Sequence, residues 1–319
     1  MARWVPILAT VALLGACAST PDSPPPEPVP SVTSATVTPA LPTTSPTPTP
    51  TPSAAPFDPS EAHRTVAELA VLGPREATGE AYARASELVS TRFRTLGYQV
   101  TTQEFDVPAG TSWGVRVPAG RTHNVVADPV DFDPEQPHIV IGAHLDTVPQ
   151  APGAEDNASG VAVMLELARM VADEPAGLPV RFIAFGAEEP RGSGDARHHY
   201  GSQHYVAELS GAQKAATRAM VSLDRVGVRA EAVPLAHGGR GDPAVRRALA
   251  EASPAEIPVT QVENTTSDHW SFEKAGIASA RIGSVPYAGY HTPRDTPGVV
   301  AEDQLGRVGA VMWAWLRTL

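Results

Sequence analysis

The sequence has almost no cysteine, very little lysine and only a short apolar run near its start. Cys17 is the sole cysteine, so no disulfide bond can form within the chain. Only two lysines are present, the formal net charge is −11, and no basic stripe appears, which argues against nucleic acid as a partner. The apolar run from Val5 to Leu14 is too short to cross a membrane as a helix.

The start of the chain has the pattern of a secretory signal peptide. Arg3 supplies a positive charge before the short apolar run, and small residues follow that run. The ending Leu14-Gly15-Ala16-Cys17 resembles a bacterial lipobox, in which cleavage before the cysteine leaves that residue to carry a lipid. We predict a lipoprotein signal peptide at residues 1–17 and a secreted, cell-surface protein that is anchored to the membrane by a lipid on Cys17. The alternative is a free thiol.

Residues 18–56 consist almost entirely of Pro, Thr, Ser, Ala and Val. Such a segment has too little apolar surface to offset the entropy lost on ordering, and its prolines favour an extended backbone. We therefore predict a disordered tether that could reach on the order of 100 Å at roughly 3 Å per residue.

Residues 57–319 have the size of one large α/β domain and show no internal repeat. Helical spacing of apolar residues predicts helices over 60–72, 79–96, 159–172 and 301–319. Alternation predicts a strand over 98–107, and nearly continuous apolar runs predict strands covered on both faces over 138–143, 180–185, 219–223 and 278–282. The helix at 159–172 lies between two such strands, which indicates a βαβ crossover. We predict an α/β fold with a mostly parallel central sheet and helices on both faces.

Histidines and carboxylates follow the predicted parallel strands. Binding sites in open α/β sheets lie outside the carboxyl ends of the strands, so these side chains should converge on one crevice. Each alone is explained more simply as a helix cap, a solvated charge or a hydrogen-bonded core residue. Together, so many like charges would repel one another unless cations neutralised them. The seven residues are His144, Asp146, Asp156, Glu188, Glu189, Asp224 and His291.

The types of these side chains indicate which metal they would bind. Imidazole and carboxylate without thiolate, in an exported protein, suit zinc, with cobalt or manganese also compatible. Asp156, Glu189 and Asp224 bring three negative charges, and a bridging hydroxide would bring a fourth. That charge balances two divalent ions, so we predict two zinc ions as cofactors.

The candidate ligands lie in six short motifs. These are Gly142-Ala143-His144-Leu145-Asp146-Thr147, Gly153 to Gly160, Phe185-Gly186-Ala187-Glu188-Glu189, Ser222-Leu223-Asp224, Ser267-Asp268-His269 and Tyr290 to Thr296. The set resembles the di-zinc exopeptidases, which include bacterial leucyl aminopeptidases and aminopeptidase Y and, more distantly, glutamate carboxypeptidase and the glutaminyl cyclases. The resemblance spans about residues 62–319 and implies the phosphorylase/hydrolase-like zinc exopeptidase fold.

The resemblance also implies which residues bind each metal ion. One zinc ion would be held by His144 and Asp224, and the other by Glu189 and His291. Asp156 would bridge both ions.

Further residues acquire roles from the same resemblance. Glu188 would be the general base, which takes a proton from the attacking water and passes it to the leaving amine. Tyr290 would help to stabilise the oxyanion, and Asp146 would sit behind His144 and orient its ring. A cis peptide bond is implied between the bridging aspartate and Asn157.

One segment departs from the family pattern. Residues 190–202, between the glutamate pair and Gly201-Ser202, are longer than the usual short link, which leaves substrate preference open. His198, His199 and His204 could form an extra metal site, but we expect them to be solvated histidines.

We therefore predict a zinc metallo-exopeptidase of the aminopeptidase type. It would be a monomer that hydrolyses N-terminal residues from peptide substrates through a hydroxide bridging two metal ions. A carboxypeptidase or dipeptidase using the same site, a glutaminyl cyclase, and an inactive surface binding lipoprotein are the alternatives.

Overall fold

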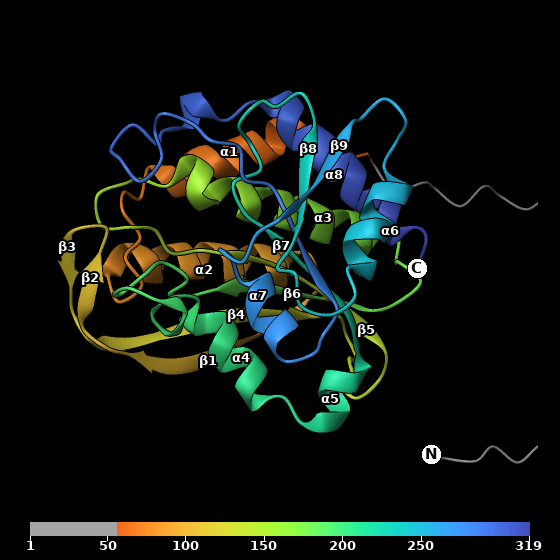
Figure 1. Cartoon of the computed structure of the whole chain (residues 1–319), viewed down its shortest axis with the longest axis horizontal. Coiled ribbons are helices and arrows are strands. Elements are labelled where there is room, and N and C mark those ends of the chain that lie inside the picture. The colour runs from red at the N-terminus through yellow and green to blue at the C-terminus, as the bar shows by residue number, and fades with distance from the viewer. Residues whose placement is uncertain (1–55) are drawn as a thin grey trace, which may run out of the picture. The chain divides into compact units, whose positions relative to one another are not determined.

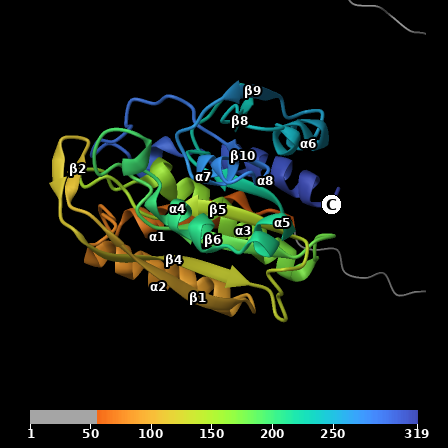
Figure 2. The same cartoon turned by 60° about the horizontal axis from the view of Figure 1, so that its bottom comes forward.

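An eight-stranded mixed sheet forms the centre of the structure, a computed structural model that describes residues 56–319. The predicted signal peptide, Cys17 and residues 18–55 of the predicted tether lie outside the described residues. Figures 1 and 2 show the sheet with helices on either side. In order across the sheet, the strands are β1 (Gln99–Val107), β4 (Gly120–Asp128), β6 (Val180–Phe185), β5 (His138–His144), β7 (Thr217–Leu223), β10 (Ser279–Ile282), β8 (Val233–His237) and β9 (Val259–Glu263).

The four central strands β6, β5, β7 and β10 run parallel to one another. β1 and β4 pair antiparallel at one edge, and β4 also lies antiparallel to β6. At the other edge β8 is antiparallel to β10 and parallel to β9. A separate hairpin of β2 (Gly110–Ser112) and β3 (Val115–Val117) connects β1 to β4. The predicted α/β fold with a mostly parallel central sheet is confirmed.

Helices cover both faces of the sheet. On one face α2 packs against β1 and β4, α3 against β5, β6 and β7, and α6 against β8 and β10, with α1 and α8 outside α3. On the other face α4 and α7 pack together, and α5 contacts β7 (Figure 1). The helices are α1 (Pro59–Ala70), α2 (Glu80–Thr95), α3 (Gly160–Asp173), α4 (Tyr200–Glu208), α5 (Gly211–Ala216), α6 (Ala244–Ala252), α7 (His269–Lys274) and α8 (Glu302–Leu316).

The central strands are mostly apolar because both of their faces are buried. In β5, Ile139 and Ile141 point into the core on the side of α3, whereas Val140 points into a second core with Phe185 and Phe272. Successive side chains of a strand alternate between faces, so a strand covered on both sides needs apolar residues at most of its successive positions. None of the described helices has the length and apolar character needed to span a membrane.

Candidate metal centre

The seven predicted polar side chains meet at the carboxyl ends of the central strands. His144 is the last residue of β5, Asp224 directly follows β7, and the Glu188–Glu189 pair follows β6. Asp156 lies in the segment Ala154–Ser159, immediately before α3, and its backbone there is not helical (φ −112°, ψ 86°). His291 comes from the long connection between β10 and α8.

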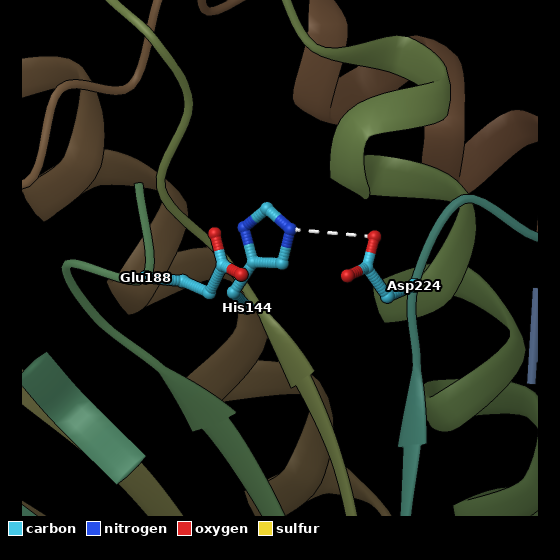
Figure 3. A group of neighbouring side chains, drawn as sticks. All are labelled: His144, Glu188 and Asp224. Carbon is cyan, nitrogen blue, oxygen red and sulfur yellow. Dashed lines mark ion pairs between the residues drawn. The ribbon is translucent and has the colours of Figure 1, made fainter. Parts of the chain in front are cut away.

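These side chains form two groups of potential metal ligands, each with ligand atoms within 4.8 Å of one another. His144, Glu188 and Asp224 form one group (Figure 3), and Asp156, Glu189 and His291 form the other. In the figure His144 and Asp224 extend from the ends of two strands, and 3.7 Å separates the His144 Nε2 atom from Asp224 Oδ1.

Asp156 lies between the two groups and contacts a histidine of each. Its Oδ1 atom is 3.1 Å from His144 Nε2, and its Oδ2 atom is 3.0 Å from His291 Nε2. His291 Nε2 is also 3.3 Å from Glu189 Oε1. This is the position that a bridging carboxylate would require.

Burial and neighbouring side chains shift the pKa values of the carboxylates in the centre. It raises the pKa of Glu188 to about 8, helped by repulsion from Asp224 and other carboxylates. Burial likewise raises the pKa of Glu189 to about 8. Burial also opposes ionisation of Asp156, but hydrogen bonds with the two histidines outweigh it and lower its pKa. The centre therefore holds charge that further cations would stabilise.

The donor atoms suit two divalent ions of the zinc type. Among residues 56–319, the buried Asp224 Oδ1 atom has no hydrogen-bond partner although it lies 3.7 Å from His144 Nε2, so a lone pair remains for a metal ion. Each group combines imidazole nitrogen with carboxylate oxygen and contains no thiolate, which is the ligand chemistry of zinc in enzymes. The residues present fit such ions.

Asp146 connects His144 to the glutamate pair. The His144 Nδ1 atom lies 3.1 Å from the Asp146 backbone oxygen and 3.8 Å from its carboxylate. That carboxylate accepts hydrogen bonds from the backbone N–H groups of Glu188 at 2.9 Å and Glu189 at 3.1 Å. Asp146 is thus behind His144, and it also fixes the backbone from which both glutamates project.

Two residues to which the sequence reasoning gave no role hold the bridging segment. Asp295 accepts hydrogen bonds from the backbone N–H groups of Glu155 at 2.8 Å and Asp156 at 3.1 Å. Asn157 donates its side-chain N–H to the Leu223 carbonyl at 2.8 Å, which ties the segment to the end of β7. The Asp156–Asn157 peptide bond is cis, as the resemblance implied.

Arg75 organises the loop that leads from β5 to the bridging segment. Its guanidinium is fully buried and donates to the carbonyls of Leu145 at 2.9 Å, Pro152 at 2.6 Å and Gly153 at 2.9 Å. Burial lowers the pKa of Arg75 to about 10, so the group stays charged at neutral pH. A buried arginine with so many backbone partners is invisible to sequence patterns because its partners are far along the chain.

The metal centre opens into a cavity of about 260 Å³ that includes Trp113, Tyr290 and Arg225 in its wall. The ring of Tyr290 stacks on His291 with centroids 3.7 Å apart, and the Arg225 guanidinium lies 4.3 Å from the centre of the Tyr290 ring. Trp113 packs edge-on against His291 at 4.3 Å. Tyr290 is therefore beside the centre.

Trp113 belongs to the β2–β3 hairpin, and Arg191 fastens the base of that hairpin. The buried Arg191 guanidinium donates to the Pro108 carbonyl at 2.8 Å and to the Pro118 carbonyl, on opposite sides of the hairpin. A side chain at Gly110 would come within 1.9 Å of the Arg191 carbonyl oxygen, so this position requires glycine. The segment after the glutamate pair thus holds one wall of the cavity.

The expectation that all three histidines near this segment are solvated is wrong for His199. This residue is only 2% exposed, and its Nε2 atom lies 3.2 Å from Glu188 Oε1. His198 is half-buried at the cavity wall, and His204 stacks on Phe105. Among residues 56–319, none of these histidines belongs to a further metal-ligand group.

Buried imidazoles and carboxylates gathered outside the carboxyl ends of parallel strands define a metal-dependent α/β protein. The chain belongs to peptidase family M28, whose model matches residues 124–316.

Individual relatives agree with this membership. Aminopeptidase YwaD of Bacillus subtilis is 34% identical over 194 residues, which cover 56% of this chain and 41% of YwaD. The probable lipoprotein aminopeptidase LpqL of Mycobacterium tuberculosis is 50% identical over 52 residues, 16% of this chain and 10% of LpqL. The chain thus matches less than half the length of either relative.

Solved structures share the fold. A zinc aminopeptidase from Bacillus subtilis superimposes with a TM-score of 0.73 at 20% identity, covering 82% of this chain and 95% of that one. Glutaminyl cyclases have the same fold. At these identities the likeness concerns the fold alone.

Proposed function

We propose that this protein is a zinc-dependent aminopeptidase that hydrolyses N-terminal residues from peptides. The observation that carries the proposal is the position of Asp156 between two ligand groups, with Glu188 beside the first group. The names of YwaD and LpqL as aminopeptidases support the choice of reaction.

Five residues would hold the metal ions. His144 and Asp224 would bind one zinc ion, Glu189 and His291 the other, and Asp156 both. When bound, the ions would supply a lowered pKa for water and positive charge beside the scissile carbonyl.

Glu188 would act as general base and then as general acid. Its carboxylate would accept a proton from the attacking water and deliver that proton to the leaving amine. The side chain is 7% exposed, at the cavity wall, so it can reach substrate while remaining shielded from bulk water. Tyr290 would donate its hydroxyl hydrogen to the oxyanion that forms in the transition state.

A carboxypeptidase or dipeptidase is the second candidate because two arginines line the cavity. Arginine binds carboxylates well, so Arg225 or Arg281 could recognise a free C-terminus. Both guanidiniums are already engaged: Arg281 lies 3.1 Å from Asp224 Oδ2, and Arg225 stacks over the Tyr290 ring. This engagement favours the aminopeptidase.

We also propose that the protein is secreted and carried on a lipid at Cys17, as a monomer. The lipobox-like ending at residues 14–17 supports this location, and the name of LpqL as a lipoprotein agrees with it. Palmitate labelling of the wild-type protein and of Cys17→Ser in cells would test the anchor. Equal labelling of both would contradict it.

Matched free and N-acetylated peptides, incubated with the purified protein with and without a zinc chelator, test the reaction. Chelator-sensitive release from free peptides alone would support the aminopeptidase. Release from acetylated peptides would instead establish the carboxypeptidase. A glutaminyl peptide included in the series reports cyclisation, and no reaction at all would favour a binding lipoprotein.

A further inference from the structure

We propose that His199 is a positioning residue for Glu188, whose carboxylate it holds through an Nε2–H···Oε1 hydrogen bond during the reaction. This inference rests on the proposed peptidase function and adds a residue that acts through the general base. His199 lies in the segment after the glutamate pair that departs from the family pattern.

The contact joins a fully buried imidazole to the edge of the catalytic cavity. His199 Nε2 lies 3.2 Å from Glu188 Oε1. Neither ring nitrogen of His199 has a hydrogen-bond partner within residues 56–319, although both are buried. An unpaired buried donor is costly, so the ring gains most by turning its N–H to the carboxylate that it already touches. Catalytic hydrogen bonds are often poorly aligned without substrate and become aligned when it binds.

The backbone holds the two residues at a fixed separation. The N–H of His199 donates to the Glu188 carbonyl at 2.8 Å, and the N–H of Tyr200 donates to the Ala187 carbonyl at 2.9 Å. These two hydrogen bonds pair the segments across the loop that separates them. Asp146 accepts the N–H of Glu188, and His199 contacts both the backbone carbonyl and the carboxylate of Glu188. The general base is therefore held at three groups.

The contact itself decides which ring nitrogen carries the hydrogen. A carboxylate oxygen can only accept a hydrogen bond, so the nitrogen that lies 3.2 Å from Glu188 Oε1 must be the donor. We therefore assign that hydrogen to Nε2. Oε1 is then occupied by His199, which leaves Oε2 of Glu188 to face the water.

Two amide substitutions separate this role from a purely structural one. Glutamine carries its amide nitrogen about as far from the backbone as histidine Nε2, whereas asparagine carries its own near the position of Nδ1. His199 has a left-handed backbone with φ of 56°, which asparagine tolerates better than glutamine. A structural role therefore favours His199→Asn, whereas a positioning role favours His199→Gln.

We expect His199→Asn to lower kcat by about 10–100-fold, with KM within about two-fold of wild type. His199→Gln should keep kcat within about five-fold, in spite of a lower thermal midpoint. Bound zinc should be the same in both variants and in wild type. His204→Asn makes the same replacement outside the cavity and should retain wild-type kcat.

Three outcomes would overturn the proposal. The first is an unchanged kcat in His199→Asn. The second is a lower kcat in whichever variant has the lower thermal midpoint, and the third is a loss of bound zinc that parallels the loss of kcat. If wild type itself shows no chelator-sensitive peptide hydrolysis, the proposed function has failed, and the positioning role fails with it. Active wild type with an equally active His199→Asn rejects the positioning role alone.

Discussion

The Asp295 carboxylate holds the backbone of Asp156: Asp295 Oδ2 accepts a hydrogen bond from the Asp156 N–H at 3.1 Å. On its far side Asp156 faces His144 and His291. Residues that orient a metal ligand in this way typically contribute about 10–100-fold to affinity. We predict that Asp295→Asn weakens zinc binding by about that factor, because the amide replaces one acceptor with a donor.

Competition with a chromophoric zinc chelator would measure this change. Asp303→Asn is the matched control, since Asp303 is an exposed carboxylate that pairs with Arg229 and does not line the cavity. The control should bind zinc as wild type does. Wild-type zinc affinity in Asp295→Asn would show that residues 154–159 keep their conformation without the Asp295 carboxylate.

Glu188→Gln should separate catalysis from metal binding. The amide keeps the shape of the side chain but accepts no proton, so we expect kcat to fall by about 10²–10⁴-fold with zinc content retained. Glu189→Gln, at the adjacent position, should instead lower zinc content, because Glu189 belongs to the second ligand group. Unchanged turnover in Glu188→Gln would refute the general-base assignment.

In the zinc-free protein, the free energy of unfolding should fall as pH rises. Burial raises the pKa of Glu188 and Glu189 to about 8 in the metal-free protein, from about 4.3 in unfolded chains. The folded state then binds more protons than the unfolded state. The contribution of the two glutamates to the free energy of unfolding is therefore complete below about pH 4 and is lost as pH rises toward 8.

Thermal midpoints between pH 5 and 8.5, with zinc and with chelator, would test this dependence. The midpoint of the metal-free protein should fall across the range. The stabilisation by zinc should grow, because fewer protons compete for the ligands. A metal-free midpoint that rises with pH would contradict the predicted sign.

Trp113→Ala should change substrate preference more than stability. The indole is 53% exposed and packs against His291 at the cavity wall, so it offers an apolar surface to a substrate side chain. We expect KM to rise by about 5–50-fold for peptides with large apolar N-terminal residues and to change little for alanyl peptides. Val115→Ala removes an exposed side chain of the same hairpin outside the cavity and is the control. Equal effects on both peptide classes would argue against contact with that side chain.

The parts of the fold that could be predicted are those in which a local pattern reflects burial. The strands at 138–143 and 180–185 are mostly apolar because both faces are covered, and their order along the chain predicted that the candidate ligands would lie at one edge of the sheet. β4 was not predicted, because it begins with the polar sequence Gly-Arg-Thr-His-Asn.

The supporting residues of the site depend on contacts across the fold, which a linear pattern does not contain. Arg75 donates to carbonyls 70 to 78 residues away, and Asp295 supports an amide nearly 140 residues earlier. His199 could be read only as a loop residue until the structure placed it against Glu188. A buried side chain in an irregular segment leaves no periodic signal in the sequence.

The clamp formed by Arg191 has a consequence for how this protein could diversify. The guanidinium binds backbone carbonyls, which every residue type possesses, whereas Gly110 has no room for a side chain and Gly114 has a left-handed backbone with φ of 86°. Substitutions at the exposed positions Thr111, Trp113, Val115 and Arg116 would therefore leave this clamp in place. The wall of the cavity can thus change during evolution or engineering while the metal-binding residues stay the same.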